Sequence, residues 1–195
     1  MRSGTDPSPE ATSPPAWAEL DAAAKRERLL TAAAGVFTDH GLDAPMPAVA
    51  RAAGAGVGSL YRQFPSKEEL VAALAERRLV ALEAELRSAL RQPAAWAALE
   101  AFVWRVLGED ASDDVAAQAV ATAGTLSPVR QARERVWALL DRLVDRAREQ
   151  GDVRADASRR DVTMTIAAAR AVRRLGPDDW RRMVQLALDG LRARG

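Results

Sequence analysis

The sequence predicts an all-α protein with an N-terminal three-helix, helix-turn-helix domain and a roughly six-helix bundle behind it. Apolar residues make up 48% of the 195 residues, which is enough to form a proper core. They recur at the three- and four-residue spacing of amphipathic helices, and no run of alternating β-branched residues predicts a strand. Glycine and proline break the helical pattern at short intervals between residues 41 and 65, as in two short helices joined by a turn.

The N-terminal domain is expected over residues 21–65. The preceding residues, 1–20, hold four of the ten prolines and are expected to form a disordered tail. Asp21 is a good N-cap for the first helix, and Gly41 is placed to end it.

Two short helices are expected next, over about 46–53 and 57–63. Gly54 between them supplies a residue that is free to leave the helical region, which a tight turn requires. The side chains of the three helices that are expected to face inward are Leu29, Leu30, Ala33, Val36, Phe37, Met46, Val49, Ala50, Val57, Leu60 and Phe64.

The second domain is expected over residues 66–195. Pro65 sets its boundary, and Ser66 with Glu69 forms the capping box of a long helix. The last helix is expected over about 178–193. The boundaries in between are expected at Pro93, at Ser112 or Asp113, at Ser127-Pro128, at Gly151, at the capping residues Ser158–Asp161, and at Gly176-Pro177.

The composition excludes several classes of site. The chain has no cysteine, and His40 is its only histidine, so thiolate metal sites and sites of several imidazoles are excluded. Because His40 lies at a helix C-terminus, where a cation is favourable, we interpret it as a capping residue. No nucleophile–base pair is visible, so we expect neither an enzyme nor a cofactor.

The chain also lacks an apolar segment of membrane-spanning length. No stretch approaches 18 uncharged apolar residues, and the N-terminal residues have no apolar core of the kind a secretory signal carries. We therefore expect a cytoplasmic protein, and contact of the basic segment described below with DNA would make it nucleoid-associated.

Two further patterns have an ordinary structural interpretation. Gly54-x-Gly56-x-Gly58 follows a helix instead of a strand and lacks the lysine of a phosphate-binding loop, so nucleotide binding is not favoured. The aspartates at 110, 113 and 114 are better explained as capping and exposed residues of a helix start than as a cation site.

The charge is unevenly distributed, although the net charge is only +1. Residues 1–24 carry a net charge of −3, whereas residues 25–67 carry a net charge of +3. The positive charge is thus concentrated on the helix-turn-helix segment, as contact with nucleic acid requires.

The second short helix is expected to present a polar face to DNA. In this architecture its outer face enters the major groove, and small residues at its start allow the backbone to approach. The Tyr61 and Ser59 hydroxyls are suited to phosphates, and Arg62 or Gln63 to base edges or backbone. Lys67 is badly placed for the dipole of the next helix, which a phosphate partner would explain. The residues expected to contact DNA are Pro45, Gly56, Gly58, Ser59, Tyr61, Arg62, Gln63 and Lys67.

Residues 41–75 resemble the DNA-binding domain of the TetR/AcrR family of regulators. The shared features are Ala53-Gly54, the Leu60-Tyr61 pair with Phe64 three residues on, and the run Ser66–Leu70. The loop before the penultimate helix, Gly151–Asp156, and the end of the last helix resemble one subgroup of the family. Gly56 departs from the family pattern, where many relatives have serine, and Pro47 lies early in its helix.

The resemblance implies a ligand-responsive regulator, usually a repressor and less commonly an activator. It implies a homodimer formed through the last two helices, a palindromic double-stranded DNA operator, and a small-molecule effector bound among the central helices. The effector releases the protein by moving the two DNA-binding heads out of register with successive major grooves, which lie roughly 34–36 Å apart. An effector that prefers this state weakens DNA binding by the ratio of its two affinities.

Four aromatic residues of the central helices suit an apolar or aromatic effector, with core packing as their alternative role. They are Trp96, Phe102, Trp104 and Trp137. The residues expected at the dimer interface are Ile166, Ala169, Val172, Val184, Ala187, Leu188 and Leu191.

A basic cluster is expected at the end of the penultimate helix. Arg170, Arg173 and Arg174 suit either that helix's own C-terminus or acids such as Asp178 and Asp179 across a dimer interface.

A helical adaptor that binds only protein is the alternative function. Such a module needs neither the motif from Leu60 to Leu70 nor local positive charge, so DNA binding is favoured.

Overall fold

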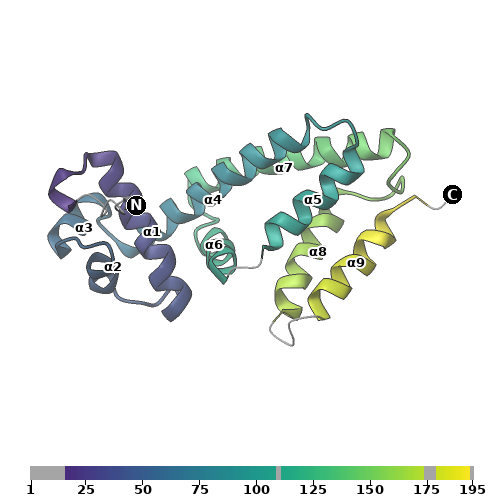
Figure 1. Cartoon of the computed structure of the whole chain (residues 1–195). Helices are drawn as coiled ribbons and strands as arrows, with labels where there is room; N and C mark the ends of the chain where they lie inside the picture. Colours follow the sequence, from purple (N-terminus) through teal and green to yellow (C-terminus); the bar gives the residue numbers. More distant parts are fainter. Residues whose placement is uncertain (1–15, 109–110, 174–178, 194–195) are drawn as a thin grey trace, which may run out of the picture.

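The computed structural model describes residues 16–108, 111–173 and 179–193, and these ranges contain helices and no sheet (Figure 1). The expected all-α fold is confirmed. The elements are the 3-10 helix η1 (Trp17–Glu19) and the α-helices α1 (Ala22–His40), α2 (Met46–Ala52), α3 (Val57–Gln63), α4 (Lys67–Ala89), α5 (Ala95–Leu107), α6 (Ala111–Thr122), α7 (Ser127–Glu149), α8 (Arg159–Val172) and α9 (Asp179–Leu191).

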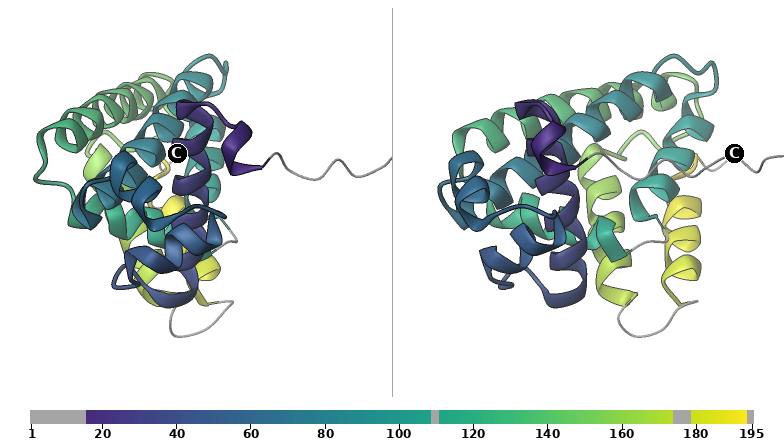
Figure 2. Two further views of the ribbon diagram at one scale, coloured as in Figure 1. Left: turned by 90° about the vertical axis from the view of Figure 1, so that its left-hand side faces the viewer. Right: turned by 60° about the vertical axis from the view of Figure 1, so that its left-hand side comes forward.

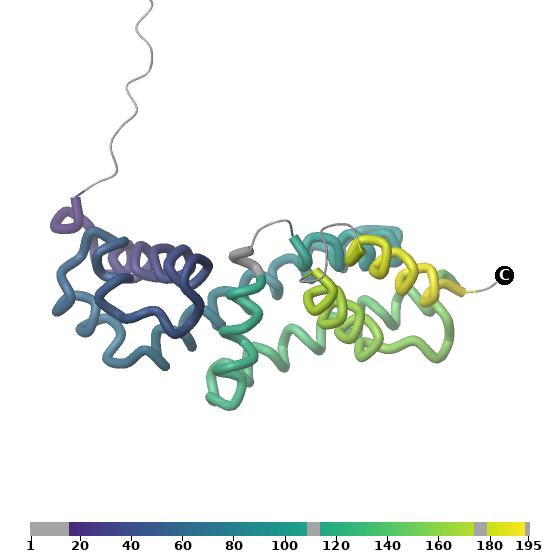
Figure 3. Tube along the Cα trace, turned by 90° about the horizontal axis from the view of Figure 1, so that it is seen from below, coloured from purple at the N-terminus to yellow at the C-terminus, as the bar shows by residue number. Residues whose placement is uncertain are grey.

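The molecule is elongated, with α1, α2 and α3 forming a head at one end (Figures 1 and 3). α4 leads from this head into the bundle and packs along α7. α6 lies between the head and the bundle and contacts both α1 and α4. α8 and α9 pack side by side, with α5 against α7 and α8, as two further views show (Figure 2). None of the described helices combines the length and apolar character that crossing a bilayer requires.

The head follows the sequence prediction closely. The Asp21 carboxylate accepts the Ala24 N–H at 2.7 Å and caps α1, which ends at Gly41 in the left-handed region, at φ 76°. The side chains of Phe37, Leu60 and Phe64 are at most 1% exposed and form its core.

Two expectations for the head need correction. Val57 was expected to face inward but is 42% exposed, because as the first residue of α3 it lies on the same helical face as exposed Tyr61, four residues on. The tail expected over 1–20 lies largely outside the described residues, but Trp17–Glu19 forms η1, and Trp17 packs against the core.

Three helices of the bundle begin at positions other than those expected. α5 begins at Ala95 instead of Pro93, because the Gln150 side chain accepts the Ala95 N–H and donates to the Pro93 carbonyl, each at 2.8 Å. α7 has Leu126 as its N-cap, so that Ser127 and Pro128 lie in its first turn. α6 begins at Ala111, so the expected caps, Ser112 and Asp113, lie within it.

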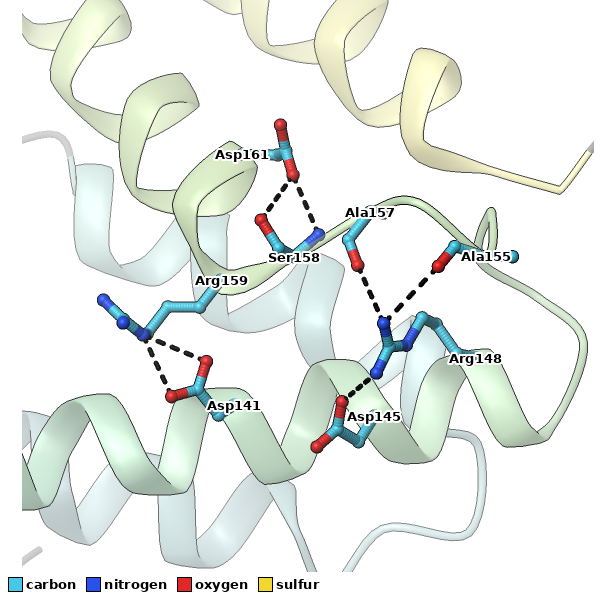
Figure 4. A network of polar contacts seen from close by, with 8 residues as sticks. All are labelled: Asp141, Asp145, Arg148, Ala155, Ala157, Ser158, Arg159 and Asp161. Atoms are coloured by element: carbon cyan, nitrogen blue, oxygen red, sulfur yellow. Dashed lines mark hydrogen bonds and ion pairs between the residues drawn. The ribbon is translucent and has the colours of Figure 1, made fainter.

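The connection from α7 to α8 is held by a polar network (Figure 4). Asp161 accepts the Ser158 N–H and hydroxyl, each at 2.8 Å, which completes the expected capping box. These hydrogen bonds hold the pKa of the Asp161 carboxyl below its usual value. Arg159 donates to both carboxylate oxygens of Asp141, and Arg148 contacts Asp145 and two loop carbonyls.

The end of α9 is held by the same loop. The Arg154 N–H donates to the Leu191 carbonyl at 3.0 Å, and the Ala193 N–H donates to the Asp152 carbonyl at 2.9 Å. The α7–α8 loop therefore fixes the C-terminal end of the last helix.

The basic cluster of α8 caps a different helix from the one expected. Arg170 donates to the Val106 carbonyl at 3.1 Å, and Arg173 donates to the carbonyls of Leu107 and Gly108. The two arginines thus interact with the C-terminus of α5 instead of that of α8, because α5 packs across α8. Both also pair with Asp114 of α6. Arg174 and Asp178 lie outside the described residues.

Candidate nucleic-acid interface

The turn between α2 and α3 has the geometry of a helix-turn-helix. Gly54 has φ 67°, the conformation that the sequence required of it. Ala50 and Ala53 are at most 1% exposed, so the two helices approach closely there. Leu60 is fully buried against the head, which leaves the opposite face of α3 directed outward.

The structure gathers the expected DNA-contacting residues on and beside this outward face. Pro45 and Gly56 are the N-caps of α2 and α3. The residues that are exposed are Pro45, Gly56, Gly58, Tyr61 and Arg62, and those that are half-buried are Ser59, Gln63 and Lys67.

Two side chains within α3 are tied together before any partner binds. Arg62 donates to the Ser59 hydroxyl at 2.7 Å, across one helical turn. This bond restricts the long Arg62 side chain, which lowers the entropy lost when it binds a phosphate or base.

Val57, which was expected to face inward, belongs to this surface together with the predicted residue Tyr61. Val57 and Tyr61 are 42% and 45% exposed and follow one another on α3, so the outward face has an apolar and aromatic component. The four-residue spacing from Tyr61 was the available signal for Val57.

Arg26 of α1 also lies beside the recognition helix. Its guanidinium lies 4.4 Å from the centroid of the Phe64 ring and donates to the Gln63 carbonyl at 3.4 Å. It therefore holds the end of α3 against α1 and adds a positive charge near the outward face.

The first turn of α4 continues the surface with charges of both signs. Lys67 lies there, half-buried in the first turn of α4. The Ser66 hydroxyl accepts the Glu69 N–H at 3.2 Å. The pKa of the Glu68 carboxyl lies below its usual value, because the carboxylate accepts hydrogen bonds from its own backbone N–H and from the Ser66 hydroxyl.

Arg77 connects the head to the rest of the molecule. It pairs with Glu27 of α1 at 2.7 Å and donates to the Thr31 hydroxyl and the Leu30 carbonyl. The position of α1, and with it that of α3, is therefore coupled to that of α4.

The four aromatic residues expected to line an effector pocket have separate surroundings. Trp104 faces Trp180 of α9 at 6.1 Å, and Arg192 lies 5.2 Å above Trp96. Trp137 lies between the guanidiniums of Arg133 and Arg159. Phe102 is buried in the core. Trp96 and Phe102 are buried in the core, as their alternative role predicts, whereas Trp104 and Trp137 are half-buried.

Most of the expected dimer-interface residues are buried within one protomer. Ile166, Ala169, Val184 and Leu188 are 0–9% exposed, and Val172, Ala187 and Leu191 are half-buried. The four buried residues pack within the core of one protomer, whereas the three half-buried ones keep part of their surface accessible. Among the described residues of these two helices, the large apolar side chains that are exposed are Met164 and Leu186, at 57% and 53%.

Among the described residues, no three acidic or histidine side chains come close enough together to hold a metal ion. The described polar clusters instead pair arginines with carboxylates or with helix-end carbonyls.

Comparison with known proteins identifies both parts of the chain. Residues 29–74 match the family described as bacterial regulatory proteins of the tetR family, and residues 92–193 match the SbtR-like transcriptional regulator C-terminal domain. None of the curated proteins matches the chain.

Solved structures agree in fold over most of the chain. A TetR regulatory protein from Mycobacterium vanbaalenii is 30% identical, with 87% of this chain and 95% of that chain covered and a TM-score of 0.64. A TetR regulator from Streptomyces coelicolor is also 30% identical, with coverages of 87% and 99% and a TM-score of 0.65. The fatty acid degradation regulator from Bacillus halodurans, at 21% identity, 87% and 97% coverage and a TM-score of 0.68, shares the fold.

The matched families and the two 30%-identical structures are all described as regulatory proteins or transcriptional regulators. With its helix-turn-helix head, its helical bundle and the matches to both, this chain belongs to the TetR family of DNA-binding transcriptional regulators.

Proposed function

We propose that the protein is a homodimeric repressor that binds a palindromic operator and is released by a small molecule. The observation that carries the proposal is the outward face of α3, where Tyr61 and Arg62 are exposed beside small residues while Leu60 anchors the helix from behind.

We assign contacts with base edges, which read the DNA sequence, and contacts with phosphates, which do not, to two sets of residues. Arg62 and Gln63 are suited to base edges, since guanidinium and amide groups match the pattern of the major groove. Tyr61, Ser59 and Lys67 are suited to phosphates, which fix the position of the helix without reading sequence.

The dimer contact is proposed for the outer faces of α8 and α9. Met164 and Leu186 are large, apolar and exposed there, and Ala167, Ala168 and Ala171 are exposed on α8. Small residues allow helices of two protomers to approach closely, as in the four-helix bundle expected for the family.

Release by a small molecule is supported by the contacts between the head and the bundle. α6 contacts α1 and α4, and Arg77 ties α4 to α1, so a displacement in the bundle changes the position of α3. One relative with this fold, 24% identical, is a SmeT–triclosan complex, so a small molecule binds that protein. The partners proposed here are therefore operator DNA, a second copy of the chain and an effector.

The proposal is tested by fluorescence anisotropy of labelled DNA from upstream of the gene, titrated with the full chain at low salt. Binding to one segment is expected to exceed binding to unrelated DNA by about a thousandfold or more. Tyr61→Ala should weaken binding to all sequences, whereas Arg91→Ala, an exposed change far from the head, should not. Equal affinity for every segment would contradict operator recognition.

A further inference from the structure

A groove at the junction of the head and the bundle has the size and lining of a small-molecule site. Its volume is about 510 Å3, within the range of roughly 300 to 1,000 Å3 that ligand pockets occupy. We call it the junction groove. It is lined by Leu42, Asp43, Lys67, Glu68, Val71, Thr122, Ala123, Thr125 and Leu126.

Its walls come from three separate parts of the fold. Leu42 and Asp43 belong to the turn between α1 and α2, Lys67 to Val71 belong to the first turns of α4, and residues 122–126 join α6 to α7. One wall therefore belongs to the head, and the opposite wall belongs to the bundle.

The lining combines an apolar floor with a polar rim. Val71 and Ala123 are each 5% exposed and form the floor, while Leu126 is a large apolar side chain that is 42% exposed. Asp43 and Glu68 are exposed carboxylates, and the Thr122 and Thr125 hydroxyls lie on the bundle side.

The charge in the groove favours a cation. Two carboxylates and one ammonium line it, and the structure records no ion pair among the three in this described region. Hydrogen bonds to the first turn of α4 keep Glu68 ionised, since they lower the pKa of its carboxyl. The Lys67 ammonium is the group for which a DNA phosphate is proposed, so DNA binding would draw it away from the two carboxylates.

We propose that the junction groove binds a small amphipathic organic cation, with its apolar body on Val71, Ala123 and Leu126 and its charge between Asp43 and Glu68. We further propose that occupancy weakens operator binding, a step that rests on the proposed function. A ligand that touches the head and the bundle together binds differently whenever their separation changes, and this difference in affinity is what couples the two sites.

The groove is tested first without DNA. The full chain, with labelled leucine and valine methyl groups, is titrated by NMR with benzyltrimethylammonium, and separately with benzyl alcohol and with benzoate. The cation is expected to shift the methyl signals of Leu42, Val71 and Leu126. Shifts confined to the interior of the bundle, stronger binding of benzoate, or no shift at about 10 mM would each overturn the proposal.

Charge-removing variants test the role of the carboxylates. Asp43→Asn and Glu68→Gln should each weaken binding of the cation by about twofold to fivefold, the range of an exposed charge pair. Glu69→Gln is the matched control, because Glu69 is exposed in the same turn of α4 but does not line the groove. An equal loss in the control, or no loss in either groove variant, would contradict the assignment.

The coupling is tested with DNA present. Saturating benzyltrimethylammonium is expected to raise the Kd for operator DNA by about fivefold or more, and Glu68→Gln should reduce this effect. Tetramethylammonium at the same concentration controls for ionic strength. An unchanged or lowered Kd would overturn the regulatory step. A chain that binds the cation but no operator would instead disprove the proposed function and leave the site in place.

Discussion

The Arg26 guanidinium lies over the Phe64 ring, 4.4 Å from its centroid, and thereby joins the first helix to the end of the recognition helix. Phe64 is almost fully buried, whereas Arg26 is exposed, so this contact holds the position of α3 from the solvent side of the head. The orientation of the outward face of α3 therefore depends on a residue outside the helix-turn-helix itself.

We expect Arg26→Ala to weaken operator binding by about threefold to tenfold, because the variant loses both the stacking on Phe64 and a nearby charge. Arg26→Lys should restore only part of this affinity, since a lysine keeps the charge but not the planar stacking group. Anisotropy titrations measure both variants. If Arg26→Lys binds the operator as tightly as the unchanged protein, the positive charge and not the stacking on Phe64 accounts for the contribution of Arg26.

Lys67 should contribute to affinity without contributing to sequence preference. Lys67→Ala is expected to lower the slope of log K against log salt by about one for each subunit, and to weaken specific and non-specific DNA alike. Arg91→Ala provides the comparison, since Arg91 is exposed in the α4–α5 connection. A slope that stays constant in Lys67→Ala would rule out the phosphate contact.

Two glycine substitutions should have opposite effects on stability. Gly54→Ala is expected to lower the free energy of unfolding by about 1 to 2 kcal/mol, because a residue with a side chain is strained at φ 67°. Gly35→Ala should stabilise by about 0.5 to 1 kcal/mol, because Gly35 lies within α1 and an added Cβ meets nothing within 4 Å. Urea denaturation measures both. A stabilising Gly54→Ala would contradict the turn geometry.

The capping box of α8 should make stability depend on acid. The pKa of Asp161 is lowered in the folded state, so its contribution is complete above the ordinary carboxyl pKa of about 4 and is lost as pH falls through the lower, folded value. Asp161→Asn should therefore reduce Tm most at neutral pH, and its effect on Tm should shrink as pH falls below the ordinary carboxyl pKa of about 4. The control is Asp152→Asn, at an exposed position. The difference in Tm between this variant and the unchanged protein should stay the same as the pH falls.

A charge placed on the outer face of α8 or α9 should separate the protomers. Met164→Glu and Leu186→Arg each bury an unpaired charge if this face forms the dimer contact, so a monomeric mass is expected at micromolar concentration by light scattering. Val80→Glu, at an equally exposed position of α4, should remain dimeric. A dimer that persists in both test variants would place the interface elsewhere.

The local signals in the sequence determined most of the fold. Asp21, Gly41, Gly54 and Ser66 act through their own backbone neighbours, and each was found where its chemistry predicted. The start of α5 could not be predicted in this way, because the group that caps it, Gln150, lies 55 residues away along the chain.

Most of the outward face of α3 was predictable for the same reason, since it follows from helical spacing within seven residues, but Val57 was wrongly expected to face inward. The effector and dimer residues stay predictions, because apolar periodicity identifies the side chains that face a core but does not separate the core of one protomer from a core shared by two. Ile166 and Leu188 fit an interface pattern, yet they are buried within the protomer. Arg26 gave no periodic signal, since its partners lie on another helix.

Arg77 and Arg78 are consecutive on α4, yet they hold different parts of the molecule. Arg77 binds α1, and Arg78 donates to the Val106 carbonyl at the end of α5 at 3.4 Å. Their side chains leave the helix about 100° apart. A rotation of α4 about its own axis would therefore displace both guanidiniums from their acceptors in α1 and α5. These two contacts oppose rotation of the middle of α4 about its axis. The head is therefore moved most easily when α4 tilts or slides as one rigid helix.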